Sequence, residues 1–352
     1  MMSEKTDMRK AVVHLRFTEE KKKEIRSYLL EKIREQKPGL SKAVAEALGV
    51  NQATVHGYLN ELADAGAIVR VRRGEYRLVR QQFDCTLDLE AGDFDDETEV
   101  YDRCLREHVR DFPKNVRDIW AYAFSEMMNN VIDHSGADTV RILVTQDCLD
   151  TEVTITDNGE GIFEHIRRYF RLPSAEDAIL ELFKGKLTTD AQHHSGEGIF
   201  FTSRLMDTFV IISGGKSFTH NRYDAGRVFD IPDFSQGTCV VMRLSNHSAK
   251  QPQEVFDRYS DVGGGFSRTH ILLKNMFDAS PVSRSQAKRV CSRLGQFREV
   301  VLDFEDVSWM GQGFAHQVFV VFRNEHPAVK LVPVHMNEAV EKMYRHVTAP
   351  GD

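Results

Sequence analysis

Three short polar motifs between Ala123 and Leu205 combine residue types that could bind a nucleotide. Ser-Glu-Met-Met-Asn-Asn occupies Ser125–Asn130 within a helical pattern, and Asp-Asn-Gly-Glu-Gly-Ile occupies Asp157–Ile162 directly after a strand pattern. His-Ser-Gly-Glu-Gly-Ile, at His194–Ile199, opens a second helical pattern. Each motif alone is a weak signal, but the three in this order predict an ATP pocket.

Glu126 and Asn130 are four residues apart, so on a helix beginning near Val116 they share one face. The amide oxygen of such an Asn can hold magnesium, and the carboxylate can act on a water molecule as a general base. Surface pairs without any chemistry have the same spacing. Only the neighbouring motifs favour a site here.

Asp157 follows the second of two strand patterns, at Thr139–Gln146 and Glu152–Thr156. A carboxylate at a strand end is well placed to accept a hydrogen bond from an adenine amino group. Gly159 and Gly161 would let the backbone turn sharply and approach a ligand closely.

The three motifs and a later Gly-Thr pair resemble the GHKL ATPase superfamily, which includes the DNA gyrases, the heat-shock protein 90 chaperones, sensor histidine kinases and the anti-sigma-factor serine kinases. The resemblance covers residues 103–248 and implies an α/β sandwich, with a mixed sheet and helices on one face, that binds ATP and Mg²⁺. It implies that Asp157 binds adenine and that Gly159 and Gly161 shape the adenine and ribose rim. Thr238 would support the adenine side.

The same resemblance implies the phosphate contacts. Asn130 would hold the magnesium ion, and Glu126 would be the general base. Gly196 and Gly198 would form the phosphate lid at a helix N-terminus, where backbone N–H groups and the helix dipole favour anions. Residues 163–193 would be the mobile lid region.

Other polar residues near these motifs could take part. Lys184 and Lys186 could reach a γ-phosphate from the lid region or lie on the solvated surface. Histidine kinases phosphorylate a His on a separate dimerisation helix, and no such helix is evident before residue 103. His108 and His134 are the nearby histidines, and we expect His134 to be structural or to line the pocket.

Composition sets the broad class. The 352 residues are 41% hydrophobic and 28% charged, enough for two or three soluble domains. No apolar run is long enough to span a membrane, and the charged start lacks a signal peptide, so we expect a cytoplasmic protein. The five cysteines form no Cys-x-x-Cys pair, which favours buried thiols over disulfides or zinc.

Charge is unevenly distributed along the chain. Residues 1–80 hold 17 Lys and Arg against 11 Asp and Glu, although the whole chain has a net charge of −7. From Asp84 to Asp102 there are nine acids and no Lys or Arg, which predicts an acidic linker over residues 83–102. A basic head is typical of a module that faces nucleic acid.

Residues 20–82 resemble a winged helix-turn-helix. Helical patterns at Lys21–Leu30, Leu40–Leu48 and Gln52–Ala63 precede an alternating apolar and basic segment, 66–78, that predicts a β-hairpin. The resemblance implies that the third helix enters a major groove and that the hairpin neutralises phosphates of duplex DNA. The implied contact residues are Asn51, Gln52, Thr54, His56, Arg70, Arg72, Arg73 and Arg77. A winged helix that contacts only protein is the alternative.

The C-terminal residues 265–350 resemble a STAS-like α/β domain. A helix opening at Ser283, a buried strand at Glu299–Phe304, a helix to Phe322 and a further strand and helix predict a βαβα unit. Anti-sigma-factor antagonists with this fold accept phosphate on a Ser at a helix start. Gly311-Gln312 stands there instead, so phosphate acceptance is not expected.

Three functions remain open from the sequence. The first is an ATP-dependent regulator in the cytoplasm of a bacterium, with a DNA-binding head, a magnesium-ATP switch with slow ATPase activity, and a domain for a regulatory protein partner. The second is a serine/threonine protein kinase of the anti-sigma-factor type. The third is an ATP-binding scaffold whose winged helix contacts protein. The chain could also form a homodimer.

Overall fold

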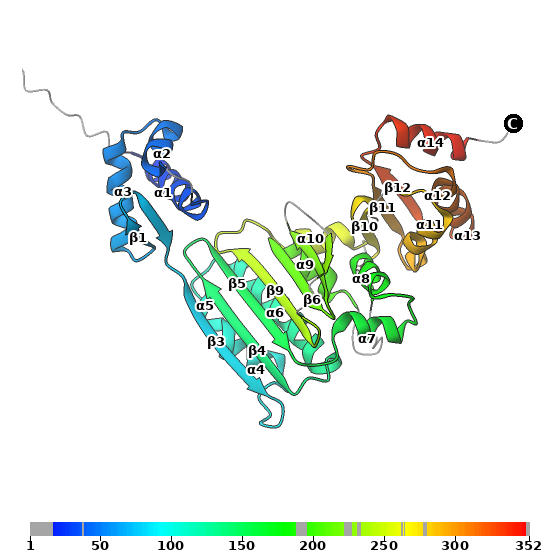
Figure 1. Ribbon diagram of the computed structural model, residues 1–352, viewed down its shortest axis with the longest axis horizontal. Helices are drawn as coiled ribbons and strands as arrows, with labels where there is room; N and C mark the ends of the chain where they lie inside the picture. Colours follow the sequence, from blue (N-terminus) through cyan, green and yellow to red (C-terminus); the bar gives the residue numbers. More distant parts are fainter. Residues whose placement is uncertain are drawn as a thin grey trace, which may run out of the picture. The chain divides into compact units, whose positions relative to one another are not determined.

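The protein forms two compact units, one ending at Gln81 and the other beginning at Gln82. The computed structural model (Figure 1) describes residues 17–36, 39–187, 196–221, 227–230, 234–261, 263, 265–276 and 280–349. None of the helices in these ranges is long and apolar enough to cross a membrane.

The N-terminal unit contains three helices and a two-stranded hairpin. These are α1 (Glu19–Arg34), α2 (Leu40–Leu48), α3 (Gln52–Asp64), β1 (Ile68–Arg72) and β2 (Glu75–Leu78). The elements lie close to the predicted segments, and β1 pairs antiparallel with β2. Ile25, Leu29 and Val44 are buried with Val55 and Leu59, so one apolar face of each helix forms a separate small core.

The second unit is built around a seven-stranded sheet, which we call the central sheet. Its order is β3-β4-β5-β9-β6-β7-β8. The strands are β3 (Gln81–Asp88), β4 (Thr139–Gln146), β5 (Asp150–Asp157), β6 (Thr208–Ser213), β7 (Lys216–Asn221), β8 (Arg227–Asp230) and β9 (Thr238–Ser245). The five pairs from β4 to β8 are antiparallel, and three of them join strands that follow each other directly in the chain.

Helices cover one face of the central sheet. Figure 1 shows α4, α5 and α6 together behind the strands. The longest helix, α6, buries Val116, Ile119, Ala123, Met127 and Val131 at helical spacing. The helices of this region are α4 (Glu97–Tyr101), the π-helix η1 (Asp102–Arg106), α5 (Glu107–Val109), α6 (Lys114–His134), α7 (Ile162–Tyr169), α8 (Ala175–Lys184), α9 (Gly198–Leu205) and α10 (Pro252–Tyr259).

The predicted acidic linker is wrong. Residues 83–102 include most of β3 and all of α4, and they contribute to the main hydrophobic core. On β3, Phe83, Cys85 and Leu87 point towards the core while Asp84 and the other intervening residues are exposed. Asp84 and Asp88 therefore occupy the outer face of an edge strand, and the other acids lie in the turn after it and around α4.

The C-terminal part has a three-stranded parallel sheet, β10-β11-β12, with the strands at Arg268–Leu272, Glu299–Asp303 and Lys330–Val334. The predicted βαβα elements are present, and β10 precedes them. Ser283 caps α11 by accepting the N–H of Gln286. The helices are η2 (Leu273–Asn275), α11 (Arg284–Cys291), η3 (Leu294–Gln296), α12 (Gln312–His316), the π-helix η4 (Gln317–Phe322), α13 (Arg323–Glu325) and α14 (Glu338–Thr348).

The Lys184 side chain links α8 to α11 within the second unit. It is fully buried, and Nζ donates to Glu181 Oε1 at 2.7 Å and to the carbonyls of Arg289 and Ser292 at 2.9 Å. Asp177 of the same helix accepts a 2.6 Å hydrogen bond from Arg289 Nε. The proposed contact between Lys184 and a γ-phosphate is therefore wrong, because these carbonyls and Glu181 already use its charge.

Candidate functional site

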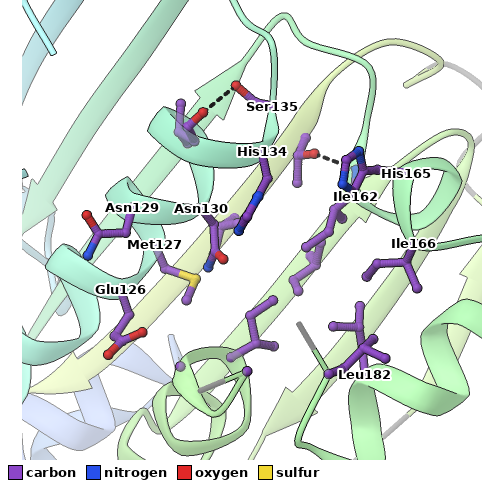
Figure 2. Close-up of a pocket in the computed structure, with 18 of the residues that line it drawn as sticks. Glu126, Met127, Asn129, Asn130, His134, Ser135, Ile162, His165, Ile166 and Leu182 are labelled. Atoms are coloured by element: carbon purple, nitrogen blue, oxygen red, sulfur yellow. Dashed lines mark hydrogen bonds between the residues drawn. The ribbon is translucent and has the colours of Figure 1, made fainter. Parts of the chain in front are cut away.

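A cavity of about 360 Å³ lies between the helices and the central sheet of the second unit. Glu126, Asn130 and His134 of α6 form one wall, and Ile162 and His165 of α7 lie opposite them (Figure 2). The floor and rim are largely apolar. They include Met127, Val131, Ile166, Leu182, Leu187, Ile199, Phe200, Ile211 and Val240.

Asp157 is the buried acid at the end of β5. Only 6% of it is exposed, and its Oδ1 accepts the N–H groups of Gly159 at 2.9 Å and Thr238 at 3.2 Å. Oδ2 receives no hydrogen bond from any other described residue and the side chain lines the cavity. Burial raises the pKa of Asp157, although the two N–H groups act in the opposite direction. The site therefore holds a carboxylate that can still accept a hydrogen bond.

Thr238 lies beside Asp157, and its predicted support of the adenine side stays a prediction. The two residues face each other across β5 and β9, and Thr238 lines the cavity. Thr238 Oγ1 accepts the N–H of Ile162 at 3.0 Å. Thr238 therefore fixes the start of α7 as well as the position of the carboxylate.

Gly159 and Gly161 are not among the described residues that line the cavity, and their predicted role in shaping the adenine and ribose rim stays a prediction. A Cβ on Gly159 would lie 2.1 Å from the carbonyl oxygen of Ser135. Gly161 has φ +87°, and a Cβ there would lie 2.6 Å from Ser213 Oγ. These glycines permit the close packing that holds Asp157 in place.

Glu126 and Asn130 both face the cavity from α6, one helical turn apart. A Cβ on Gly198 would lie 2.0 Å from Glu126 Oε2, so the carboxylate touches the first residue of α9. Side chains from two separated motifs thus meet at one point. This juxtaposition could place a carboxylate and an amide oxygen beside bound phosphates.

The start of α9 offers backbone donors to the cavity. Gly196 and Gly198 line it, and the N–H groups of Ile199 and Phe200 have no acceptor among the described residues. Gly196 has φ +70°, and a Cβ there would lie 2.5 Å from the backbone of Leu187. Free N–H groups at a helix start favour an anion. Residues 188–195, which include His194 and Ser195 of the third motif and part of the expected lid, lie outside the described residues.

The histidines of the cavity were only partly foreseen. His134 lines the pocket, as one of the two expected roles, whereas His108 stacks on Phe83 with ring centroids 3.8 Å apart. His165, 6.0 Å from the His134 ring, and Asn129 also line the cavity. Burial lowers the pKa of His165. In the sequence, the one indication that His165 lines the cavity is its position just after the glycine motif. Lys186 does not line the cavity and instead donates to the carbonyl of Gln296 at 3.1 Å.

Of the candidate DNA-contact residues of the N-terminal unit, most are exposed and two take part in capping α3. Gln52 and His56 are exposed, as are the four arginines of the hairpin, Arg70, Arg72, Arg73 and Arg77. Asn51 caps α3, because its Oδ1 accepts from Thr54 N at 2.7 Å and Thr54 Oγ1 at 3.0 Å. Asn51 and Thr54 therefore stabilise the helix start. Val69 and Val71 are also about half exposed on β1, an arrangement that suits the protein-contact alternative.

Gln312 begins α12 in the C-terminal part and is exposed. Its neighbour Gly311 is buried, and Ser308, the nearest hydroxyl before the helix, lies 3.1 Å from Ser280 Oγ.

Two family comparisons agree with this geometry. Residues 115–248, which include every described residue that lines the cavity, match the family described as histidine kinase-, DNA gyrase B- and HSP90-like ATPases. Residues 286–341 match a STAS-like domain of unknown function. No curated protein sequence matches the chain.

Proposed function

We propose that this chain, which contains a GHKL ATPase-type domain at 115–248 and a STAS-like domain at 286–341, is a regulator switched by magnesium-ATP. The observation that carries the proposal is the pairing of a buried acceptor with free donors in one cavity. Asp157 offers a carboxylate oxygen to the cavity, and α9 offers N–H groups near Glu126. This is the polarity that an adenine and a triphosphate require.

Magnesium fits the part of the cavity where Glu126 lies near the start of α9. Asn130 supplies an amide oxygen there, and oxygen ligands are those that Mg²⁺ prefers. The ion would neutralise charge on the phosphates. Glu126 would take a proton from the attacking water, which makes slow ATP hydrolysis the favoured activity.

The test is a calorimetric titration with ATP, with and without Mg²⁺, of the wild type and Asp157→Asn. In the variant an NH₂ group can face the adenine amino group, so two donors meet. Affinity should fall about tenfold or more, since an unpaired buried polar group costs about 1–3 kcal/mol. The thermal midpoint should not fall, because the buried charge is removed.

Asp84→Asn is the matched control, since Asp84 pairs with Arg141 on the exposed face of β3. It should bind ATP like the wild type. Absence of ATP binding by the wild-type protein would refute the assignment.

Two other functions use the same pocket. In a serine/threonine kinase, labelled phosphate from ATP would appear on a protein. Within the STAS-like domain, Ser308 is the candidate acceptor, because it is the nearest hydroxyl before α12. In a scaffold, ATP would bind without turnover above background. The regulator is favoured because Glu126 is in the cavity while Gln312 offers no nucleophile at the helix start.

The N-terminal unit is proposed to bind duplex DNA through its hairpin. Four arginines lie within eight positions and all are exposed. Glu75 pairs with Arg72 and, at 3.8 Å, with Arg77, so part of this charge is already neutralised. We therefore expect about three phosphate contacts.

The measurement is DNA affinity against salt, with a fragment of residues 1–82, because this unit has its own core. Three contacts predict a slope of log K against log salt of about −2.7. Arg72→Ala with Arg73→Ala should flatten the slope by about two units. Lys22→Ala with Lys32→Ala removes the same charge from α1 and should leave the slope nearly unchanged. Failure to bind at low salt would make this unit a protein-contact module.

A further inference from the structure

A second cavity, of about 210 Å³, lies where α9, α10 and β7 meet β10. Four of its described lining residues are basic: Arg204, His220, Arg258 and His270. The others are Phe183, Val255, Tyr259 and Leu272, so no Asp or Glu is among the described lining residues. The two arginines therefore give the cavity positive charge that none of its described lining residues offsets.

Among the described residues, the two arginines have no carboxylate partners. Arg204 Cζ lies 3.3 Å from the Phe200 ring centroid and 5.3 Å from that of Tyr259. Arg204 Nη1 donates to the Phe200 carbonyl and to Ser203 Oγ, both at 3.0 Å. No described Asp or Glu forms an ion pair with Arg204 or Arg258. A buried guanidinium held only by neutral groups is costly, and an anion would offset that cost.

His220 supplies an independent indication of a missing ligand. Its Nδ1 is buried and has no hydrogen-bond partner among the described residues. Burial and the nearby charges of Arg204 and Lys250 lower the pKa of His220 to about 3. The neutral ring can donate a hydrogen bond, and buried polar atoms without partners are rare in native proteins.

The nearest acid on β11 does not neutralise this cluster. Asp303 accepts from His270 Nε2 at 2.8 Å, and it also accepts from His335 Nδ1 at 2.9 Å. Asp303 is not among the described residues that line the cavity. Its charge is shared between the two histidines. The positive field in the cavity persists.

We propose that this cavity binds a small phosphate-bearing anion through Arg204, Arg258 and His220. Arginine and imidazole N–H groups are suited to phosphate oxygens. The volume is well below the 360 Å³ of the first cavity, which favours inorganic phosphate or a small phosphomonoester over a nucleotide. This assignment does not depend on what the first cavity binds.

Helix α9 gives the second site a route to the first. Gly198, Ile199 and Phe200 line the first cavity, and Arg204 lines the second one turn later. An anion that fixes Arg204 would also fix the ring of Phe200. If ATP binds as proposed, the anion should change its affinity.

The test is calorimetry of the full chain with inorganic phosphate, at constant ionic strength. Arg258→Ala should weaken phosphate binding about tenfold, as expected for loss of a charge-assisted hydrogen bond. Arg258 is exposed, so the variant should keep its thermal midpoint. Arg323→Ala, an exposed arginine on α13, removes the same charge elsewhere and should bind phosphate normally.

Glycerol phosphate in a parallel titration distinguishes the source of the anion. Tighter binding than inorganic phosphate identifies a phosphomonoester, and weaker or equal binding identifies the free ion. Absence of phosphate binding, or equal affinity in Arg258→Ala and the wild type, would overturn the proposal. So would loss of phosphate binding in Asn130→Ala alone, because that residue belongs to the first cavity. ATP titration of the same variants reports separately on the proposed switch.

Discussion

The ends of β5 and β11 have the same local build but different surroundings. Asp157 ends the first strand and Asp303 ends the second, and both are buried. In each, Oδ1 accepts the N–H of the residue two positions later at 2.9 Å. The aspartate and its turn alone therefore do not distinguish a ligand site from a structural one.

The remaining partners make the difference. Asp157 keeps an oxygen facing the cavity, and burial raises its pKa. Burial acts in the same direction on Asp303, but the Glu305 N–H and the side chains of His335 and His270 outweigh it and hold the pKa of Asp303 below its usual value. Asp303 is satisfied by its own fold, whereas Asp157 keeps an oxygen to which no other described residue donates.

The helices that follow repeat this contrast. Gly-Glu-Gly precedes Ile199 in α9, and Gly-Gln-Gly precedes Phe314 in α12. The N–H of Phe314 donates to the carbonyl of Val282 at 3.1 Å, and a Cβ on Gly311 would lie 2.5 Å from the same oxygen. The first helix opens on a cavity, whereas the 281–282 backbone covers the second. Unsatisfied polar groups mark the site better than the motif does.

The largest expected effect tests the open helix start. Glu126→Ala should leave ATP binding nearly intact and lower turnover about 10²–10⁴-fold, as for loss of a general base. Phosphate release at saturating ATP measures turnover, and calorimetry measures binding. Glu107→Ala, an exposed acid on α5, should change neither. Equal losses of binding and turnover would show that Glu126 is structural or holds the metal.

A matched pair of glycine substitutions tests the contrast itself. Gly198→Ala would place a methyl group 2.0 Å from Glu126 Oε2, so the carboxylate must move away from the start of α9 and ATP turnover should fall about tenfold or more. Gly313→Ala meets its nearest atom at 3.5 Å, so both the thermal midpoint and ATP turnover should be unchanged. The opposite ranking would mean that the two helix starts are not used differently.

Local patterns predicted much of this fold because they depend on neighbours in sequence. The 3.6-residue period gave α6 and its cavity-facing pair Glu126 and Asn130, and Ser283 marked the start of α11. Motif order was enough to predict the cavity that unites Asp157 with Gly198. These features need no knowledge of distant contacts.

The errors arose where a distant partner decides the role of a residue. The many acids of residues 83–102 suggested a linker, although Phe83, Cys85 and Leu87 alternate as the core-facing residues of β3 in the sheet. Lys184 looked like a surface or phosphate lysine, but carbonyls more than a hundred positions away surround it. His220 belongs to the same class, since its orphaned Nδ1 is visible only once β7 packs beside Arg204.

The smallest expected effect concerns the closed site, through the pair of Asp303 and His335. Asp303 raises the pKa of His335 above its usual 6.5, so the charged pair stabilises the fold fully below pH 6.5. That contribution disappears as the pH rises through the raised pKa. His335→Gln should therefore lower the thermal midpoint at pH 6 and converge with the wild type at alkaline pH. The difference should be small and salt-sensitive, because His335 is 64% exposed.

The left-handed backbone of residue 335, with φ 53°, is common to the wild type and the variant and does not titrate. His346→Gln, an exposed histidine on α14, controls for general loss of a histidine. A midpoint difference that stays constant with pH would show that His335 acts by packing. In that case His270 and the Glu305 N–H would be the groups that hold the pKa of Asp303 below its usual value.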